Sequence, residues 1–364
     1  MLYINGKFLA QRTTGVQRFS RGLLLALDQL LARRRTHDEV VLLCPPGVAY
    51  LDGLVHIKQR NCGRAGRSLT WWEQVDLPLA ARDGTLLCFS GSAPLLARRC
   101  IPTIHDAAVF LHPEAYSWKF VAWYRFLFRW MSNRVPYVLT VSNSSANDLR
   151  KFLSKPEYKV IPNAAEHIGL VDADDGVLGK LGILPRRYVL AVGSLNPTKN
   201  FASLVEAYLA SGLGPDIPLV IAGDLNRTVF SSTLAPSDGE AIVWAGPVDD
   251  AQLKALYENA LVFVFPSLYE GFGIPPLEAM SCGCPVIASN ASSIPEVCAD
   301  AALYFPPLDT AALARLLREI RDNAALRQQM IVKGKRRSSA FSWAHSGELL
   351  KRFLDDERML AGES

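Results

Sequence analysis

Short apolar runs alternate with longer amphipathic stretches along most of the chain. A run of four to six apolar residues is typical of a strand that is buried on both faces of a parallel sheet. The first series predicts a helix at about 16–35 and strands at 2–5, 40–44, 85–90, 101–106, 137–142 and 159–163. This half of the chain is therefore predicted to form a doubly wound α/β sheet.

A second series of apolar runs predicts strands at 188–194, 218–223, 241–246, 261–266 and 285–289. The intervening segment 169–185 is acidic and glycine-rich and has no strand pattern, so we expect it to be a linker. The chain is thus predicted to form two Rossmann-like doubly wound domains, over 1–168 and 186–340, with a ligand in the cleft between them.

The final segment, 341–364, contains an amphipathic helix with Leu349, Leu350, Phe353 and Leu354 on one side. It could close the second domain or cross back to the first. The chain length of 364 residues also suits two domains better than one.

The composition, 49% hydrophobic and 20% charged, is that of a well-packed soluble protein. No uncharged apolar stretch approaches the roughly 18–20 residues of a membrane span, and the N-terminal residues show no signal-peptide pattern. The default expectation is a cytoplasmic protein. Seven cysteines without paired spacing, and the lack of an Asp-x-Asp motif at a strand end, predict neither a disulfide framework nor a metal site.

Positive charge is concentrated in the first half. Residues 1–168 hold 22 Lys and Arg against 12 Asp and Glu, whereas the whole chain has a net charge of only +4. The imbalance indicates an anionic partner: a phosphate-bearing acceptor, a membrane surface or nucleic acid. Nucleic acid is the weakest of the three because no RNA-binding or helix-turn-helix signature is present. The segment 118–131, in which aromatic residues alternate with Lys and Arg, could rest on an anionic bilayer or belong to the core.

The segment 267–278 (SLYEGFGIPPLE) carries the most specific chemistry. It places Glu270 and Glu278 eight residues apart, separated by a glycine-bearing loop and a double proline that suits only the first turn of a helix. A helix N-terminus behind a glycine loop binds phosphate well, whereas the two carboxylates suit the neutral hydroxyl groups that flank a phosphate in a nucleotide sugar. Alternatively, Glu278 merely complements the helix dipole and Glu270 is a solvated loop acid.

Three further loops at predicted strand ends carry candidate residues. Gly15, in TTGVQR, would let the backbone approach a ligand closely at the start of the first helix. Lys199 could reach a diphosphate from the loop GSLNPTKN, with Ser194 and Thr198 as added donors. His105 closes a strand of the first domain, where a side chain faces the ligand edge. The alternatives are an ordinary helix cap, a solvated lysine and a structural histidine.

Taken together, these residues resemble the retaining glycosyltransferases of family 4, which have the GT-B architecture of two facing Rossmann-like domains. The resemblance covers nearly the whole chain and rests on TGVQRF, HD at 105–106, TVSNSSANDL at 140–149, VIPNA at 160–164, VGSLNPTKN at 192–200, the E-x7-E block with GCPVIAS, and a late FSW. TGVQRF together with DAAVFLHPEAYS resembles the branch of bacterial mannosyl- and rhamnosyltransferases of surface-polysaccharide assembly.

The resemblance implies that the first domain binds the acceptor and the second binds the donor. Glu270 would meet the transferring sugar, Glu278 the ribose hydroxyls and Lys199 the diphosphate, while His105 would contact the sugar or orient the acceptor. The remaining donor-binding positions implied are the backbone amides of Phe272, Gly273 and Ile274, the loop residues Gly193, Ser194 and Thr198, Gly15 from the other domain, and Val248 at the main-chain contact to the base.

One departure from the family pattern concerns the diphosphate. Family members usually have an arginine just before the lysine or just after the strand glycine, and here those positions are Thr198 and Ser194. Either Arg227, in the next strand-end loop, supplies the second positive charge, or the leaving group is less well stabilised.

These features predict a metal-independent retaining hexosyltransferase, with no cofactor, that moves mannose from GDP-mannose to a glycan or polyprenyl-linked oligosaccharide. Retention could proceed on one face of the sugar or through a covalent Glu270 intermediate. A rhamnosyl- or glucosyltransferase with a dTDP- or UDP-sugar is the alternative within enzymes, and a catalytically silent scaffold that binds a glycan or a partner protein is the alternative outside them. A dehydrogenase is disfavoured because no G-x-G-x-x-G run follows a strand.

Overall fold

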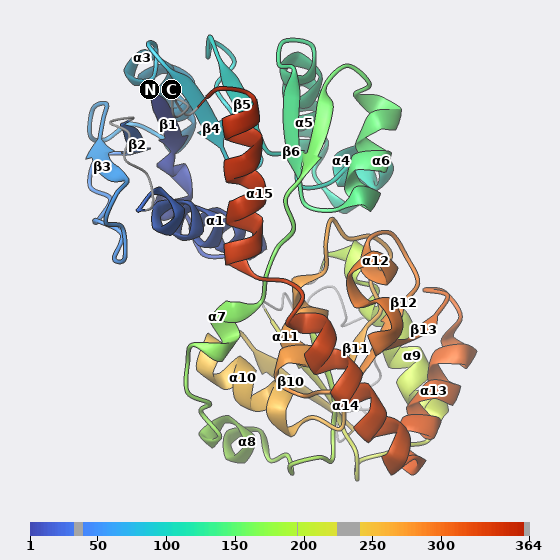
Figure 1. Cartoon of the computed structure of the whole chain (residues 1–364). Coiled ribbons are helices and arrows are strands. Elements are labelled where there is room, and N and C mark those ends of the chain that lie inside the picture. The colour runs from blue at the N-terminus through green and yellow to red at the C-terminus, as the bar shows by residue number, and fades with distance from the viewer. Residues whose placement is uncertain (33–38, 195, 224–240, 360–364) are drawn as a thin grey trace. The chain divides into compact units, whose positions relative to one another are not determined.

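The computed structural model describes residues 1–32, 39–194, 196–223 and 241–359 (Figure 1). It divides into two compact units. The first comprises Met1–Ala164 together with the C-terminal segment from Ser342, and the second comprises Ala165–Phe341. Among the described residues, no helix combines the length and the apolar character needed to cross a bilayer.

The first unit is built on a parallel sheet in the order β3-β2-β1-β4-β5. An isolated bridge between Thr103 and Leu139 joins this sheet to a parallel pair, β6 and β7. The strands are β1 (Leu2–Asn5), β2 (Val40–Cys44), β3 (Lys58–Asn61), β4 (Thr85–Cys88), β5 (Cys100–Pro102), β6 (Tyr137–Thr140) and β7 (Glu157–Val160). Strand order reverses between β1 and β4, so the loops after these two strands flank the crevice where doubly wound folds bind ligands.

The helices of the first unit include two long ones, α1 (Gly15–Leu31) and α5 (Trp118–Ser132), and the C-terminal α15 (Trp343–Asp356). The others are α2 (Leu69–Trp71), α3 (Leu77–Ala80), α4 (Ala108–Leu111) and α6 (Asn143–Phe152), with a π-helical turn at Trp72–Asp76 between α2 and α3. A core cluster of the first unit joins side chains from one face of the sheet to others from α5 and β6, among them Tyr3, Leu43, Leu86, Leu127 and Val138.

Helix α15 packs against α1 through glycines. A Cβ atom on Gly22 would come within 2.3 Å of the Trp343 ring, and one on Gly347 within 2.9 Å of the Ala26 Cβ. The Ser346 hydroxyl donates to the Pro162 carbonyl at 2.7 Å. Helix α15 therefore belongs to the first unit, although it follows α14, the last helix of the second unit, along the chain.

The second unit contains a six-stranded parallel sheet in the order β10-β9-β8-β11-β12-β13. Its strands are β8 (Val189–Val192), β9 (Leu219–Ala222), β10 (Ile242–Gly246), β11 (Val262–Phe265), β12 (Val286–Ser289) and β13 (Ala302–Phe305). Strand order reverses between β8 and β11. Both units are thus doubly wound, as the apolar pattern predicts.

Helices cover this second sheet: α7 (Glu166–Gly169), α8 (Gly176–Leu181), α9 (Phe201–Ser211), α10 (Asp250–Asn259), α11 (Ile274–Ser281), α12 (Ile294–Cys298), α13 (Thr310–Asp322) and α14 (Ala324–Ser338). The stretch 169–185, for which the sequence predicts a linker, holds α8 and lies within the second unit. Val177 and Leu178 are buried there, and the Asp174 amide donates to the Ala251 carbonyl at 3.0 Å. Within α8 itself, these two buried apolar residues are too few to produce a recognisable periodic pattern.

Several predicted elements differ from the observed ones at their ends. The strands predicted at 85–90, 101–106 and 137–142 end at Cys88, Pro102 and Thr140, because the apolar run continues past the last paired residue into the loop. Strand β3, with the sequence KQRN, is not predicted at all. It lies at the sheet edge with three of its four residues exposed, so it has no apolar run.

Candidate functional site

The loops after β8 and β11 meet where the strand order of the second sheet reverses. Lys199 lies in the first loop and Glu270 in the second, and the Lys199 Nζ atom is 2.6 Å from Glu270 Oε1. Their side chains are only 22% and 13% exposed. The structure therefore brings together, as an ion pair, the two residues that the sequence assigns to the diphosphate and to the sugar.

The backbone around Lys199 is fixed by its neighbour Asn200. Asn200 has a φ of +55°, a left-handed conformation that asparagine tolerates better than most residues. Its side-chain amide donates to the carbonyls of Pro266 at 3.1 Å and Pro307 at 2.7 Å. These bonds tie the lysine loop to the ends of β11 and β13. The Lys199 ammonium also lies 5.8 Å from the centre of the Phe265 ring.

The loop that carries Glu270 is held by two serines after β12. Ser292 Oγ accepts from the Glu270 amide at 2.8 Å, and Ser293 Oγ lies 3.0 Å from the Glu270 carbonyl and 2.9 Å from the Phe272 carbonyl. On the other side, the Leu268 amide donates to the Thr198 carbonyl at 2.7 Å. Neither serine is predicted as a site residue from the sequence, because nothing in SNASSIPE shows that they face the neighbouring loop.

Helix α11 begins directly behind this loop. Gly273 is its N-cap with a φ of +103°, no side chain caps the terminus, and Pro275 and Pro276 occupy the first turn. A helix N-terminus without a side-chain cap presents backbone N–H groups and a positive dipole end to an anion. Phe272, Gly273 and Ile274 thus lie at the terminus where the sequence predicts them to bind.

The other predicted donor-binding residues occupy neighbouring loops. Gly193 follows β8 and Gly223 follows β9. A Cβ on Gly223 would lie 1.9 Å from the Gly193 carbonyl oxygen, so the backbones beyond these two strands are in close contact. Ser194 is exposed, and Val248 lies half-buried between β10 and α10. Arg227, the proposed second positive charge, lies outside the described residues.

Thr198 is less suited to the diphosphate than the sequence suggests. Its side chain is buried, and its hydroxyl donates to Asn196 Oδ1 at 2.8 Å. The hydroxyl proton is thus used within the loop.

Glu278 is a buried acid and not a solvated one, since its residue is only 5% exposed. The Tyr257 hydroxyl donates to one carboxylate oxygen at 3.0 Å, and His167 Nε2 lies 2.8 Å from the other. Burial and the neighbouring Glu278 raise the pKa of Tyr257 well above its ordinary value, so the phenol keeps its proton. The sequence analysis missed both partners, which come from α10 and α7.

In the first unit, His105 follows β5. Its Nε2 atom lies 2.8 Å from the Phe89 carbonyl, and its ring packs edge-on against Phe19 with centroids 5.0 Å apart. Burial lowers the pKa of His105 to about 4, so the imidazole is neutral at physiological pH. A carbonyl can only accept, so Nε2 carries the proton and Nδ1 is left as an acceptor.

Gly15 starts α1, one helical turn before Phe19. Thr14 is the N-cap, and its amide donates to Gln17 Oε1 at 3.1 Å. Because Phe19 touches the His105 ring, the beginning of α1 and the loop after β5 meet at the same end of the first sheet.

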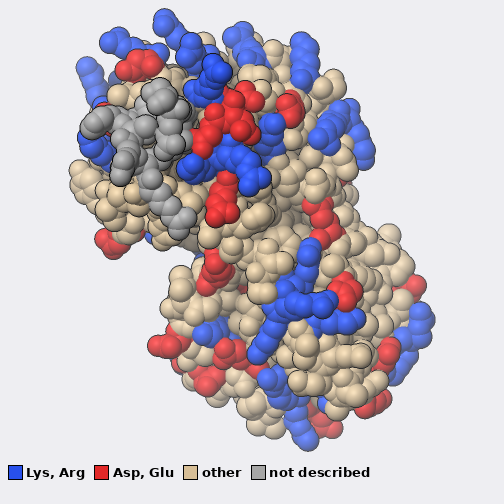
Figure 2. Space-filling model, viewed as in Figure 1, with Lys and Arg blue, Asp and Glu red and all other residues tan. Residues whose placement is uncertain are grey.

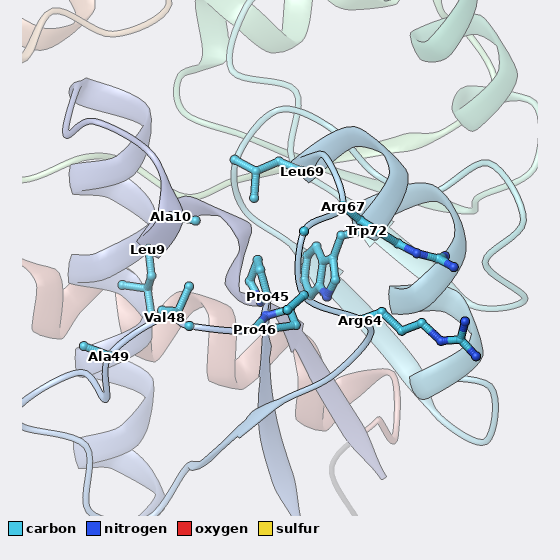
Figure 3. Close-up of a pocket in the computed structure, with 13 residues that line it drawn as sticks. Leu9, Ala10, Pro45, Pro46, Val48, Ala49, Arg64, Arg67, Leu69 and Trp72 are labelled. Atoms are coloured by element: carbon cyan, nitrogen blue, oxygen red, sulfur yellow. The ribbon is translucent and has the colours of Figure 1, made fainter.

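A pocket of about 340 Å³ opens in the first unit where β1, β2 and β3 end. Leu9, Val48 and Leu69 form apolar parts of its lining, and Trp72 borders it (Figure 3). Arg64 and Arg67 also line it, and Figure 3 shows both side chains extending to the same side of the Trp72 ring. This pocket is not predicted from the sequence, because its walls come from segments that are separate along the chain.

Helix α5 exposes part of the aromatic stripe noted in the sequence. Trp118 is 74% exposed and Phe126 48%, and Phe120 and Trp123 are exposed as well. Other residues of the helix, Val121, Leu127 and Phe128 among them, are buried in the core. The helix thus has both an apolar inner side and an aromatic outer side, and Figure 2 shows Lys and Arg side chains around it on this view of the first unit.

Within the described residues, no three His, Cys, Asp or Glu side chains lie close enough together to hold a metal ion.

Comparison with known proteins places the chain in a family. The model described as Glycosyltransferase Family 4 matches residues 23–167, and the model described as Glycosyl transferases group 1 matches residues 179–337. The O-antigen chain mannosyltransferase B of Escherichia coli is 29% identical over 360 residues, which cover 91% of this chain and 93% of that protein. The O-antigen chain mannosyltransferase RfbU of Salmonella typhimurium is 29% identical over 256 residues, covering 67% and 68%.

Among solved structures, the sucrose-phosphate synthase of Thermosynechococcus elongatus matches with a TM-score of 0.74 at 19% identity, and the match covers 98% of each chain. A likeness at this level of identity concerns the fold, which is GT-B, as predicted. Since the two family models together match most of both units, the chain belongs to the group 1 and family 4 glycosyltransferases and is a glycosyltransferase of the GT-B fold.

Proposed function

We propose that this glycosyltransferase is a retaining, metal-independent mannosyltransferase that takes mannose from GDP-mannose and extends a surface polysaccharide. The observation that carries the proposal is the Lys199–Glu270 pair, placed at the switch point of the donor sheet beside the uncapped start of α11. Both relatives named above carry mannosyltransferase in their names, which favours mannose over rhamnose or glucose.

The ion pair suggests how the donor is received. In the free protein each charge neutralises the other, so neither is left unpaired in a partly buried place. A bound diphosphate would compete for the Lys199 ammonium and release the Glu270 carboxylate toward the hydroxyls of the sugar. The backbone amides of Gly273 and Ile274 would share the negative charge, since Pro275 and Pro276 have no N–H.

Breaking the anomeric C–O bond builds negative charge on the departing diphosphate. Lys199 and the terminus of α11 would stabilise that charge, and preorganised electrostatic stabilisation of this kind is usually the largest catalytic contribution. In a metal-independent reaction, the leaving oxygen would take the proton of the acceptor hydroxyl while the acceptor oxygen bonds to the anomeric carbon on the same face of the sugar. Ser292 and Ser293 fix the backbone of Glu270 by hydrogen bonds. This backbone would hold the Glu270 carboxylate near the reacting carbon, where it would stabilise positive charge on the sugar.

His105 would act as a neutral hydrogen-bond acceptor for a sugar hydroxyl. Its Nε2–H is committed to the Phe89 carbonyl, so Nδ1 is the atom offered to a ligand. With a pKa of about 4, its ring would not gain a proton across the physiological range.

We assign the acceptor, a glycan or a polyprenyl-linked oligosaccharide, to the first unit. The pocket lined by Arg64 and Arg67, and the excess of Lys and Arg in residues 1–168, support an acceptor that carries phosphate. The exposed aromatic side chains of α5 support attachment to an anionic membrane surface, where such an acceptor would be located.

A donor screen tests this function. GDP-mannose, UDP-glucose, UDP-N-acetylglucosamine and dTDP-rhamnose would each be added to the purified protein, and thermal stabilisation and nucleotide release would be measured. The proposal predicts that GDP-mannose stabilises the protein most and is slowly hydrolysed, and that Glu270→Gln keeps the stabilisation but loses hydrolysis. If only a UDP- or dTDP-sugar stabilises the protein and is hydrolysed, that nucleotide sugar is the donor and GDP-mannose is not. Binding without turnover, even with lipid-linked acceptor present, would favour the silent scaffold.

A further inference from the structure

Glu278 is held by two side chains from outside its own helix. Tyr257, on α10, donates to Oε2 at 3.0 Å, and His167, on α7, lies 2.8 Å from Oε1. Helices α7, α10 and α11 contact one another within the second unit, as Figure 1 shows. Each carboxylate oxygen thus has its own donor, and the two donors approach from different helices.

This arrangement leaves part of the carboxylate available. An ionised carboxylate offers about four lone-pair positions, and Tyr257 and His167 use one on each oxygen. A single donor would let the group rotate about its terminal torsion, which is broad for glutamate. Two donors on different oxygens fix its plane and leave two lone-pair positions in a defined direction.

In this position, His167 does not satisfy the hydrogen-bonding capacity of both its ring nitrogens. Its second ring nitrogen, Nδ1, is buried and has no hydrogen-bond partner among the described residues. Buried polar atoms are normally paired, and an unpaired one lowers stability. The hydrogen bond to Glu278 is the one interaction of the imidazole that the contacts of this region show, so holding Glu278 is the role that the geometry supports.

We propose that Tyr257 and His167 are positioning residues for Glu278, which they orient so that its free lone pairs accept from the two adjacent hydroxyls of the nucleotide ribose. The inference rests on the donor role proposed above for Glu278. It adds two residues that are distant in sequence from the E-x7-E block. In the contacts described, neither residue touches the Lys199–Glu270 pair, so we expect their effect to fall on nucleotide recognition and not on the transfer step.

The test compares a nucleotide with ribose hydroxyls and one without them. Binding of GDP and of 2′,3′-dideoxy-GDP would be measured by calorimetry for the wild type, Tyr257→Phe, His167→Gln and Glu278→Gln. A site built to bind hydroxyls rejects a ligand that lacks them, because its buried polar groups are left unpaired. The wild type should therefore bind GDP at least about tenfold more tightly than the dideoxy compound.

The expected result is that this ratio falls toward one in both Tyr257→Phe and His167→Gln, as in Glu278→Gln. A merely structural role would weaken both nucleotides equally and leave the ratio unchanged. The control is Tyr208→Phe, which also removes a buried hydroxyl in the second unit. That hydroxyl bonds only the Gly214 and Ile217 carbonyls in the contacts described, so this variant should keep the wild-type ratio.

The outcomes separate the inference from the function on which it rests. If the wild type does not discriminate between the two nucleotides, or if Glu278→Gln keeps the discrimination, the role of Glu278 is wrong and the inference is overturned with it. If Glu278→Gln loses discrimination while Tyr257→Phe and His167→Gln retain it, the donor site stands and the positioning role is overturned. If GDP does not bind, the same comparison is made with UDP and its dideoxy analogue.

Discussion

At the scale of single residues, the burial of His105 predicts how folding stability depends on pH. Its pKa is lowered from an ordinary 6.5 to about 4 by burial. The unfolded chain therefore binds more protons at this histidine than the folded chain between those two values, and folding stability falls as the pH drops through that window. His105→Gln should flatten this part of the stability profile.

Urea unfolding of the wild type and of His105→Gln at a series of pH values would measure the effect. Between about pH 4 and 6.5 the free energy of unfolding should fall more steeply with falling pH in the wild type, by about 1.4 kcal/mol per pH unit at most. The same slope in both proteins would show that His105 is protonated freely in the folded state.

Arg64 provides a residue-scale test of the acceptor pocket. Arg64→Gln removes one of the two guanidinium groups that line it, and it should raise the KM for a phosphate-bearing acceptor about tenfold, the loss expected for one charge-assisted hydrogen bond of about 1.5 kcal/mol. Hydrolysis of the donor without acceptor should not change. The control is Arg315→Gln, which removes an exposed arginine of the second unit. Equal KM values for both variants would show that the pocket does not bind the acceptor.

Sequence reasoning identified some site residues and missed others for a physical reason. Lys199 and Glu270 follow strands, and the ends of parallel strands meet at one edge, so their proximity could be anticipated. The missed residues act through contacts between separate elements, and no local pattern distinguishes them from ordinary polar residues. They are Ser292, Ser293, Tyr257 and His167.

At the scale of elements, the α1–α15 contact predicts a sensitive glycine. Gly22→Ala would place a methyl group within 2.3 Å of the Trp343 ring. The indole is large and rigid, so the helices would have to separate, and overpacking of this kind costs about 1–3 kcal/mol. The free energy of unfolding should fall accordingly, and protease should release the C-terminal helix sooner.

The matched substitution is Gly179→Ala, since Gly179 also lies in a helix but has no atom within 4 Å of an added Cβ. Alanine is the better helix former, so this variant should be as stable as the wild type or more stable. Unchanged stability in Gly22→Ala would mean that α15 does not pack on α1 in this way.

The elements themselves were predicted unevenly. Buried strands such as β2 and β9 have continuous apolar runs and were found, whereas the exposed edge strand β3 was not. Helix α8, in the segment 169–185, has only two buried apolar residues. Its apolar pattern therefore does not distinguish this helix from a linker.

At the scale of the whole molecule, the exposed aromatic side chains of α5 predict membrane attachment. Replacing Trp118, Trp123 and Phe126 together with serine should sharply reduce sedimentation of the protein with vesicles of phosphatidylethanolamine and phosphatidylglycerol. Binding by the wild type should weaken as salt rises, because basic side chains contribute to it and salt screens exposed charges.

Leu308→Ser is the control for this experiment, since Leu308 is an exposed apolar residue of the second unit. Its sedimentation should match that of the wild type. If the triple variant also sediments with vesicles as the wild type does, the outer side of α5 is not a membrane contact.

The central claim is that Lys199 stabilises the diphosphate leaving group of a nucleotide sugar. The most direct measurement is the rate of GDP release from GDP-mannose by the wild type, Lys199→Ala and a control, Lys333→Ala, which removes a half-exposed lysine that pairs with Asp300. Loss of a preorganised positive charge at the leaving group should slow release by about 10²-fold to 10³-fold, while Lys333→Ala should match the wild type. Release by Lys199→Ala at the wild-type rate would contradict the account.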